Sequence, residues 1–174
     1  HRPAGVVEIE LVVRHGASSV PEGKSGLAAM TARMLTEGTR KKSSLALAEA
    51  VESLGTTLEA DAGRDHSSVG LSTLKPDLER GLSLLAEVIR TPAFDPKEFE
   101  RVRTEWLDGL VAERQEPQRL ASLVGLRALL GTVQGAPVSG SVPHVKALSV
   151  KDLGNFHARC YAPARRKAID SEAT

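Results

Sequence analysis

The start of the chain alternates hydrophobic and polar residues and then changes to helical spacing. Residues 6–13 place apolar side chains on one face and Glu8 and Glu10 on the other, which predicts a half-buried strand. The apolar face holds Val7, Ile9, Leu11 and Val13. After a turn cluster at 21–23, apolar residues recur every three or four positions and predict a helix over 26–37, with Gly38 suited to its end.

Further elements follow from the same spacing and from helix-capping residues. Apolar stripes and caps predict helices that begin near Ser43 or Ser44, Pro76, Asp95, Pro117 and Ser149. The third helix is expected to pack through the stripe Leu78, Leu82, Leu85 and Ile89. Residues 58–74 alternate around a Gly63-Arg64-Asp65 turn and predict a β-hairpin. Glycines and prolines in 131–143 predict a long loop.

The predicted order is strand, two helices, a hairpin, three helices, a loop and a last helix. Because strands and helices are partly segregated, this order predicts an α+β fold with a mostly antiparallel sheet covered on one face by helices. We expect residues 1–174 to be a single domain and a fragment of a longer chain.

Composition narrows the functional classes. The 23 Lys and Arg residues nearly balance 22 Asp and Glu residues, and a net charge of +1 gives no support for nucleic-acid binding. No apolar run approaches the roughly 18 residues that a membrane span needs. Cys160 is the single cysteine, which excludes an internal disulfide.

Several motifs in order, from Val6 to about Pro163, resemble the insulinase/pitrilysin-type peptidases, the inverzincins that include mitochondrial processing peptidase. The resemblance implies the N-terminal domain of such a protein, with the α+β fold predicted above. The motifs are Arg14-His15-Gly16, Pro21-Glu-Gly-x-x-Gly26-Leu27-Ala28, Glu37-Gly38-Thr39, Leu54-Gly55, Thr91-Pro92-x-Phe94 and Tyr161-Ala162-Pro163.

Active members of this family carry His-x-x-Glu-His directly after Gly-Leu-Ala, and the two histidines bind zinc. Here the first histidine position is Ala29, the glutamate position is Ala32 and the second histidine position is Arg33. A methyl group cannot bind zinc, and a permanently charged guanidinium repels it. The third ligand position falls on or beside Gly109, with Asp108 and Glu113 as the nearest acids.

The resemblance therefore implies a zinc-less, non-catalytic domain or subunit, with no catalytic, metal or cofactor-binding residues of its own. We expect it to pair with a zinc-bearing homologous subunit or domain in peptide binding and processing, and we do not expect the isolated chain to be an enzyme. One alternative is a purely structural or assembly protein like the core subunits of the respiratory bc1 complex. Another is an active zinc endopeptidase with atypical ligands. The compartment is open, although family habit and an Ala-, Arg- and Leu-rich composition favour a bacterial periplasmic or secreted protein.

Other candidate residues favour ordinary structural roles. His157 and Cys160 share a helix face but lack the further ligands of a zinc site. Asp65 and His66 are adjacent on a strand and point to opposite faces, so they cannot form a triad with Ser67 or Ser68. The glycines of 131–140 lack the lysine of a phosphate-binding loop.

The roles of several arginines also need interpretation. The run Arg101, Arg103, Arg114 and Arg119 is interpreted as a solvated face balanced by Glu98, Glu100, Glu105 and Glu113. Arg33 either pairs with an acid, faces a partner subunit or extends into solvent, and we favour the last.

Overall fold

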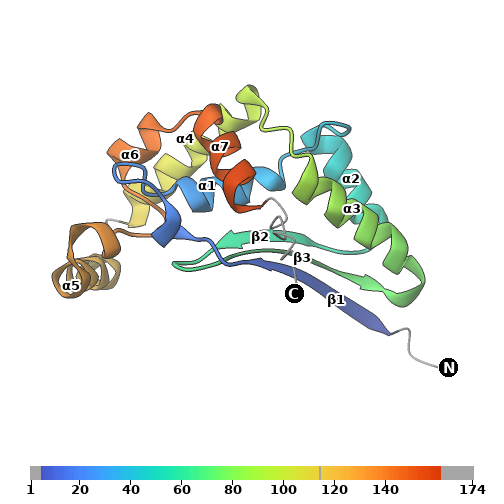
Figure 1. Ribbon diagram of the computed structural model, residues 1–174, viewed down its shortest axis with the longest axis horizontal. Helices are drawn as coiled ribbons and strands as arrows, with labels where there is room; N and C mark the ends of the chain where they lie inside the picture. The colour runs from blue at the N-terminus through green and yellow to red at the C-terminus, as the bar shows by residue number, and fades with distance from the viewer. Residues whose placement is uncertain (1–4, 114, 162–174) are drawn as a thin grey trace, which may run out of the picture.

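Helices cover one face of a small antiparallel sheet in this computed structural model, which describes residues 5–113 and 115–161 (Figure 1). This part of the chain has three strands and seven α-helices, so the predicted α+β class is confirmed. The strands are β1 (Val6–Val13), β2 (Leu58–Ala62) and β3 (Ser67–Leu74). The helices are α1 (Leu27–Leu35), α2 (Ser44–Ser53), α3 (Leu78–Arg90), α4 (Pro96–Glu113), α5 (Pro117–Gln134), α6 (Val142–Ala147) and α7 (Val150–Cys160).

The sheet has the order β1-β3-β2, with β3 paired antiparallel to both neighbours. Every second residue of β3 from Ser67 to Thr73 is buried beneath the helices, as the alternation predicts. The predicted face of β1 is only partly covered, because Leu11 is exposed near the end of this edge strand. Of the described strands, β1 and β2 therefore each leave one edge unpaired.

Helix α1 lies at the centre of the core and contacts α4, α7, β2 and β3. Nearly every residue of α1 is buried, and the exception is Arg33. The helix ends at Leu35, two residues before the predicted end. The Thr36 hydroxyl donates to the Arg33 carbonyl at 2.9 Å, which satisfies a carbonyl of the last turn. Gly38 then adopts a φ of 121°, as predicted for a glycine after a helix.

Helix α3 packs on the sheet through a different stripe from the predicted one. Its buried residues are Gly81, Leu84, Leu85 and Val88. Leu82, expected inside, is exposed. A Cβ at Gly81 would lie 3.2 Å from side-chain atoms of Leu71 and Thr73, so the absent side chain allows α3 to approach β3 closely. This close approach explains why the apolar pattern alone gave the wrong rotation.

The segment 131–143 is not the continuous loop that its glycines and prolines predict. Helix α5 extends to Gln134 across a non-helical Gly131, and α6 begins at Val142. Ser141 and Pro143 stand at the start of α6, positions that suit a helix N-terminus. The predicted capping box of Ser149 and Asp152 at the start of α7 is confirmed. No helix in the described ranges is both long and apolar enough to span a bilayer.

Candidate functional site

The three motif positions on α1 lie in two different environments. Ala29 and Ala32 are buried in the core, and their methyl groups offer no ligand atom. Arg33 lies at the edge of the core, with 46% of its side chain exposed. Only this one of the three positions therefore presents a polar group.

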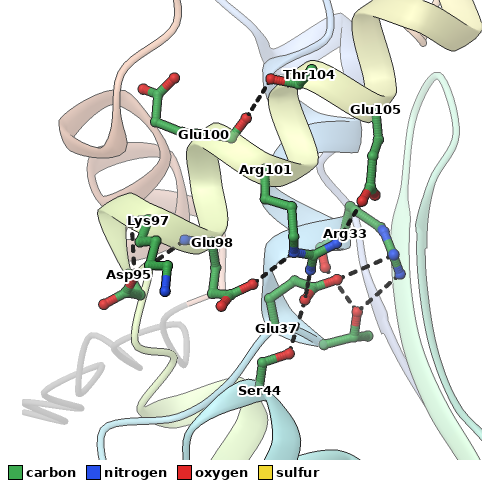
Figure 2. Close-up of polar contacts among 11 residues, drawn as sticks. Arg33, Glu37, Ser44, Asp95, Lys97, Glu98, Glu100, Arg101, Thr104 and Glu105 are labelled. Carbon is green, nitrogen blue, oxygen red and sulfur yellow. Dashed lines mark hydrogen bonds and ion pairs between the residues drawn. The ribbon is translucent and has the colours of Figure 1, made fainter.

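Arg33 is tied to an acidic residue one turn further along the chain. Its Nη2 lies 3.1 Å from Oε1 of Glu37, a carboxylate that is only 6% exposed (Figure 2). The other carboxylate oxygen of Glu37 accepts from Arg101 on α4 and, at 3.0 Å, from the Ser44 hydroxyl on α2. The interpretation of Arg33 as a side chain that only extends into solvent is wrong, because it pairs with Glu37.

Arg101 joins this ion pair to the acidic residues of its own helix. Its Nε donates to Glu98 and its Nη1 to Glu105, each at 2.8 Å (Figure 2). These two hydrogen bonds, with the charge of Glu37, raise the pKa of the Arg101 guanidinium above its usual value and keep it charged. We call Arg33, Glu37, Glu98, Arg101 and Glu105 the ion-pair cluster. It connects the end of α1 to α4.

The predicted solvated face of arginines is therefore correct in part. Arg103 pairs with Glu100, donates to the Leu148 carbonyl at 3.2 Å and lies over the Phe99 ring. Arg101 instead reaches the buried Glu37, which sequence reasoning missed. Arg114 and the side chain of Arg119 fall outside the described residues. The available signal was Glu37 itself, an acid two residues after the end of an almost wholly buried helix.

The position expected for a third zinc ligand offers no ligand atom. Gly109 is exposed on α4, and a Cβ built there meets no atom within 4 Å. Among residues 5–113 and 115–161, no group of three His, Cys, Asp or Glu side chains is arranged to hold a metal ion. Two methyl groups, one glycine and an ion-paired guanidinium do not fit zinc, which requires three or four nitrogen, sulfur or oxygen ligands.

A surface hollow of about 600 Å³ lies beside the ion-pair cluster. Arg33 and Glu37 line it together with Leu47 and Val51 of α2 and Leu58 at the start of β2. It is open to solvent and combines apolar walls with a charged rim. Such a hollow has the size of a ligand pocket, and Leu58 places it at the start of β2, whose outer edge is unpaired among the described strands.

His157 has a packing role. Its Nε2 donates to the Ile89 carbonyl at 2.8 Å, and its ring stacks on Tyr161 and meets Phe94 edge-on. Burial lowers the pKa of His157, so the neutral ring is favoured. Cys160 is buried in the core. These contacts agree with the structural interpretation of both residues.

The serine next to His66 is also engaged elsewhere. The Ser67 hydroxyl donates to the His15 carbonyl at 2.7 Å. The His66 carbonyl accepts from the Gly63 amide at 2.8 Å and closes the predicted hairpin turn. Asp65 and His66 lie in the turn before β3 and not on a strand as predicted, and the Ser67 hydroxyl is engaged by a backbone carbonyl.

Helices over one face of a small antiparallel sheet, with the motif helix α1 at the centre of the core, point to the class of insulinase-type domains. The sequence profile of the insulinase family, peptidase family M16, matches residues 1–129, and the chain belongs to this family. This confirms the resemblance drawn from the motifs.

Similar proteins include some that are named as proteases and one that is named as a non-peptidase homolog. An uncharacterized zinc protease of Mycobacterium leprae is 28% identical over 95% of this chain and 38% of its own length. The non-peptidase homolog YmxG of Helicobacter pylori is 25% identical over 88% of this chain and 36% of its own length. Subunit 1 of the bovine mitochondrial cytochrome b-c1 complex is 28% identical over 86% of this chain and 32% of its own length.

One similar solved structure is described as an inactive domain. The crystal structure of a peptidase M16 inactive domain from Pseudomonas fluorescens superposes with a TM-score of 0.86 at 29% identity. It covers 93% of this chain and 40% of that chain. The chain spans about a third of the length of the curated relatives it matches.

Proposed function

We propose that this chain is a non-catalytic domain of an insulinase-type protein and does not hydrolyse peptides itself. The observation that carries the proposal is the ion pair of Arg33 with the buried Glu37, at the helix position of a zinc-binding histidine. A cation already neutralised by a carboxylate leaves neither a ligand for a metal ion nor a base for activating water. The similarity to an inactive M16 domain supports the same conclusion.

The finer part of the proposal is that this domain pairs with a zinc-bearing homologue and helps to bind its peptide substrates. The unpaired edge of β2 supports this part, because an extended peptide adds to a free strand edge through main-chain hydrogen bonds. The hollow beside β2 offers apolar walls for one side chain of such a peptide. In this arrangement the homologue supplies the metal and this chain supplies binding surface.

A second candidate function is that of a structural subunit in a larger assembly. The relative that favours it is subunit 1 of the bovine cytochrome b-c1 complex, whose name describes a component of a complex. A structural subunit of this kind needs a stable fold and outer surfaces that contact its neighbours, and it needs no site for binding peptides.

The test is to purify the full-length protein from its native host and identify what accompanies it. A partner with an intact His-x-x-Glu-His motif, and peptide hydrolysis that rises several-fold when the two are mixed, is the expected result. Stable association with an assembly that has no peptidase supports the structural alternative. Zinc bound one-to-one by this chain alone, with hydrolysis that a chelator abolishes, would overturn the non-catalytic proposal.

A further inference from the structure

The free edge of β2 offers main-chain groups to a further strand. Among the described strands, β2 pairs with β3 alone. At the hairpin end of this pair, the Gly63 amide donates to the His66 carbonyl at 2.8 Å. Because bonded and non-bonded residues alternate along an antiparallel pair, Leu58 and Ala60 direct their N–H and C=O groups away from β3. No backbone hydrogen bond from the described residues outside the sheet reaches these groups.

The side chains of β2 alternate between two environments. Leu58 and Ala60 are partly buried and pack against the core beneath the helices. Glu59 and Asp61 are exposed on the other face of the sheet, which the helices leave uncovered (Figure 1). A strand added at this edge therefore has an apolar side and an acidic side beside it.

The two carboxylates oppose the pairing of β2 with a second copy of itself. When two β2 strands pair antiparallel about Ala60, Glu59 of each copy comes opposite Asp61 of the other. A pair centred on Glu59 or on Asp61 places that carboxylate opposite its own counterpart. Like charges directly opposite in an antiparallel pair are destabilising. Each of these registers therefore disfavours a second copy of the chain at this edge.

The same arrangement defines the segment that the edge accepts. Side chains of an added strand point alternately to the two faces of the sheet. Those on the helix side face the hollow of about 600 Å³, whose apolar walls include Leu47, Val51 and Leu58. Those on the other side come next to Glu59 and Asp61, and cross-strand pairs of opposite charge are stabilising.

We propose that Glu59 and Asp61 are the specificity-determining residues of the β2 edge. They reject a second copy of this chain and select an extended peptide that carries Lys or Arg on one face and apolar side chains on the other. This inference rests on the part of the proposed function that assigns peptide binding to β2. It adds the chemistry of the peptide and the two residues that recognise it.

Two synthetic peptides test the selection. The native peptide has the sequence of residues 55–63, and the lysine peptide carries Glu59→Lys and Asp61→Lys in that sequence, so the apolar positions of the two are identical. We expect the full-length protein without a partner to bind the lysine peptide about tenfold or more tightly than the native peptide in fluorescence anisotropy at physiological ionic strength. Equal affinities, or no binding of the lysine peptide, would overturn the proposal.

Charge reversal on the protein provides the converse measurement. The variant Glu59→Lys/Asp61→Lys should bind the native peptide more tightly than the lysine peptide. The matched control Glu8→Lys/Glu10→Lys changes two acids on β1, which β3 separates from β2, and should keep the preference of wild type. Circular dichroism confirms that each variant is folded. An equal change of preference in both variants contradicts the assignment to β2.

Amide hydrogen exchange locates the bound peptide. The amides of Leu58 and Ala60 should gain protection, whereas the amide of Glu59, directed to β3, should change little. Protection confined to another surface would contradict the proposal. The proposed function is tested separately, because the absence of a zinc-bearing partner contradicts that function, whereas equal affinities for the two peptides contradict only the charge selection.

Discussion

Arg33 and Glu37 form an ion pair across one turn at the end of α1, with 3.1 Å between Nη2 and Oε1. The pair is asymmetric, because the arginine is half exposed and the carboxylate is buried. A buried carboxylate is costly without partners, and Glu37 has Arg33, Arg101 and Ser44. The cluster thus ties the end of α1 to α2 and α4.

The two arginines of this cluster should act non-additively on stability. Arg33→Ala should cost less than about 1 kcal/mol, because Arg101 still pairs with Glu37 and the lost ion pair is partly exposed. Arg33→Ala/Arg101→Ala leaves the buried carboxylate without a cation and should cost about 3 kcal/mol or more. Urea unfolding at pH 7 measures both. Adding Glu37→Gln to the double variant should recover stability, and additive losses would contradict this coupling.

His157 should make stability fall as the pH is lowered from about 7.5 to 5.5. Burial lowers its pKa in the folded protein, so the unfolded chain binds a proton first as the pH falls. The stability that the neutral ring contributes is therefore full above the unfolded pKa of about 6.5 and lost below it. Thermal unfolding of wild type and His157→Gln measures this, and the variant should show the smaller pH dependence. Identical pH profiles would mean that another group titrates.

Gly81 should tolerate no large side chain, because α3 lies against Leu71 and Thr73 at this point. Gly81→Leu should destabilise the fold by about 2 kcal/mol or more through overpacking. The matched control is Leu82→Ala on the exposed side of the same helix, which should cost less than about 1 kcal/mol. Equal losses for the two variants in urea unfolding would favour the Leu82 stripe that the sequence pattern predicts.

Local sequence signals predicted most elements because their causes are local. The alternation of β3, the cap at Asp95 and the capping box of Ser149 and Asp152 each depend on a few neighbouring residues. The rotation of α3 depends on a contact between Gly81 and a strand residue ten positions earlier, which periodicity does not contain. Helix α6 is short, and its starting residues, Ser141 and Pro143, stand among glycines that favour a loop.

The motif positions on α1 could be located from the sequence, but the side chains that surround Arg33 could not. Ala29, Ala32 and Arg33 could be placed by motif, since they follow directly after Gly-Leu-Ala. The partner of Glu37 on α4 is 64 residues further along the chain, and only the tertiary fold brings it there. Sequence reasoning therefore assigned Arg101 to a solvated face, whereas it pairs with Glu37.

Introducing the three zinc-motif residues on α1 should not produce peptidase activity. Ala29→His/Ala32→Glu/Arg33→His supplies two zinc ligands and a general base. Gly109, at the position expected for the third ligand, still has no side chain to bind the metal, and a Cβ built there meets no atom within 4 Å. Glutamate at 32 and histidine at 29 must also replace buried methyl groups, which adds overpacking to the loss of the Arg33 partner of Glu37. We expect the triple variant to be less stable than wild type, to bind zinc weakly and to hydrolyse no fluorogenic peptide. The single variant Arg33→His controls for the lost ion pair. Zinc retained through dialysis together with hydrolysis by the triple variant would show that the rest of the metal site is still present.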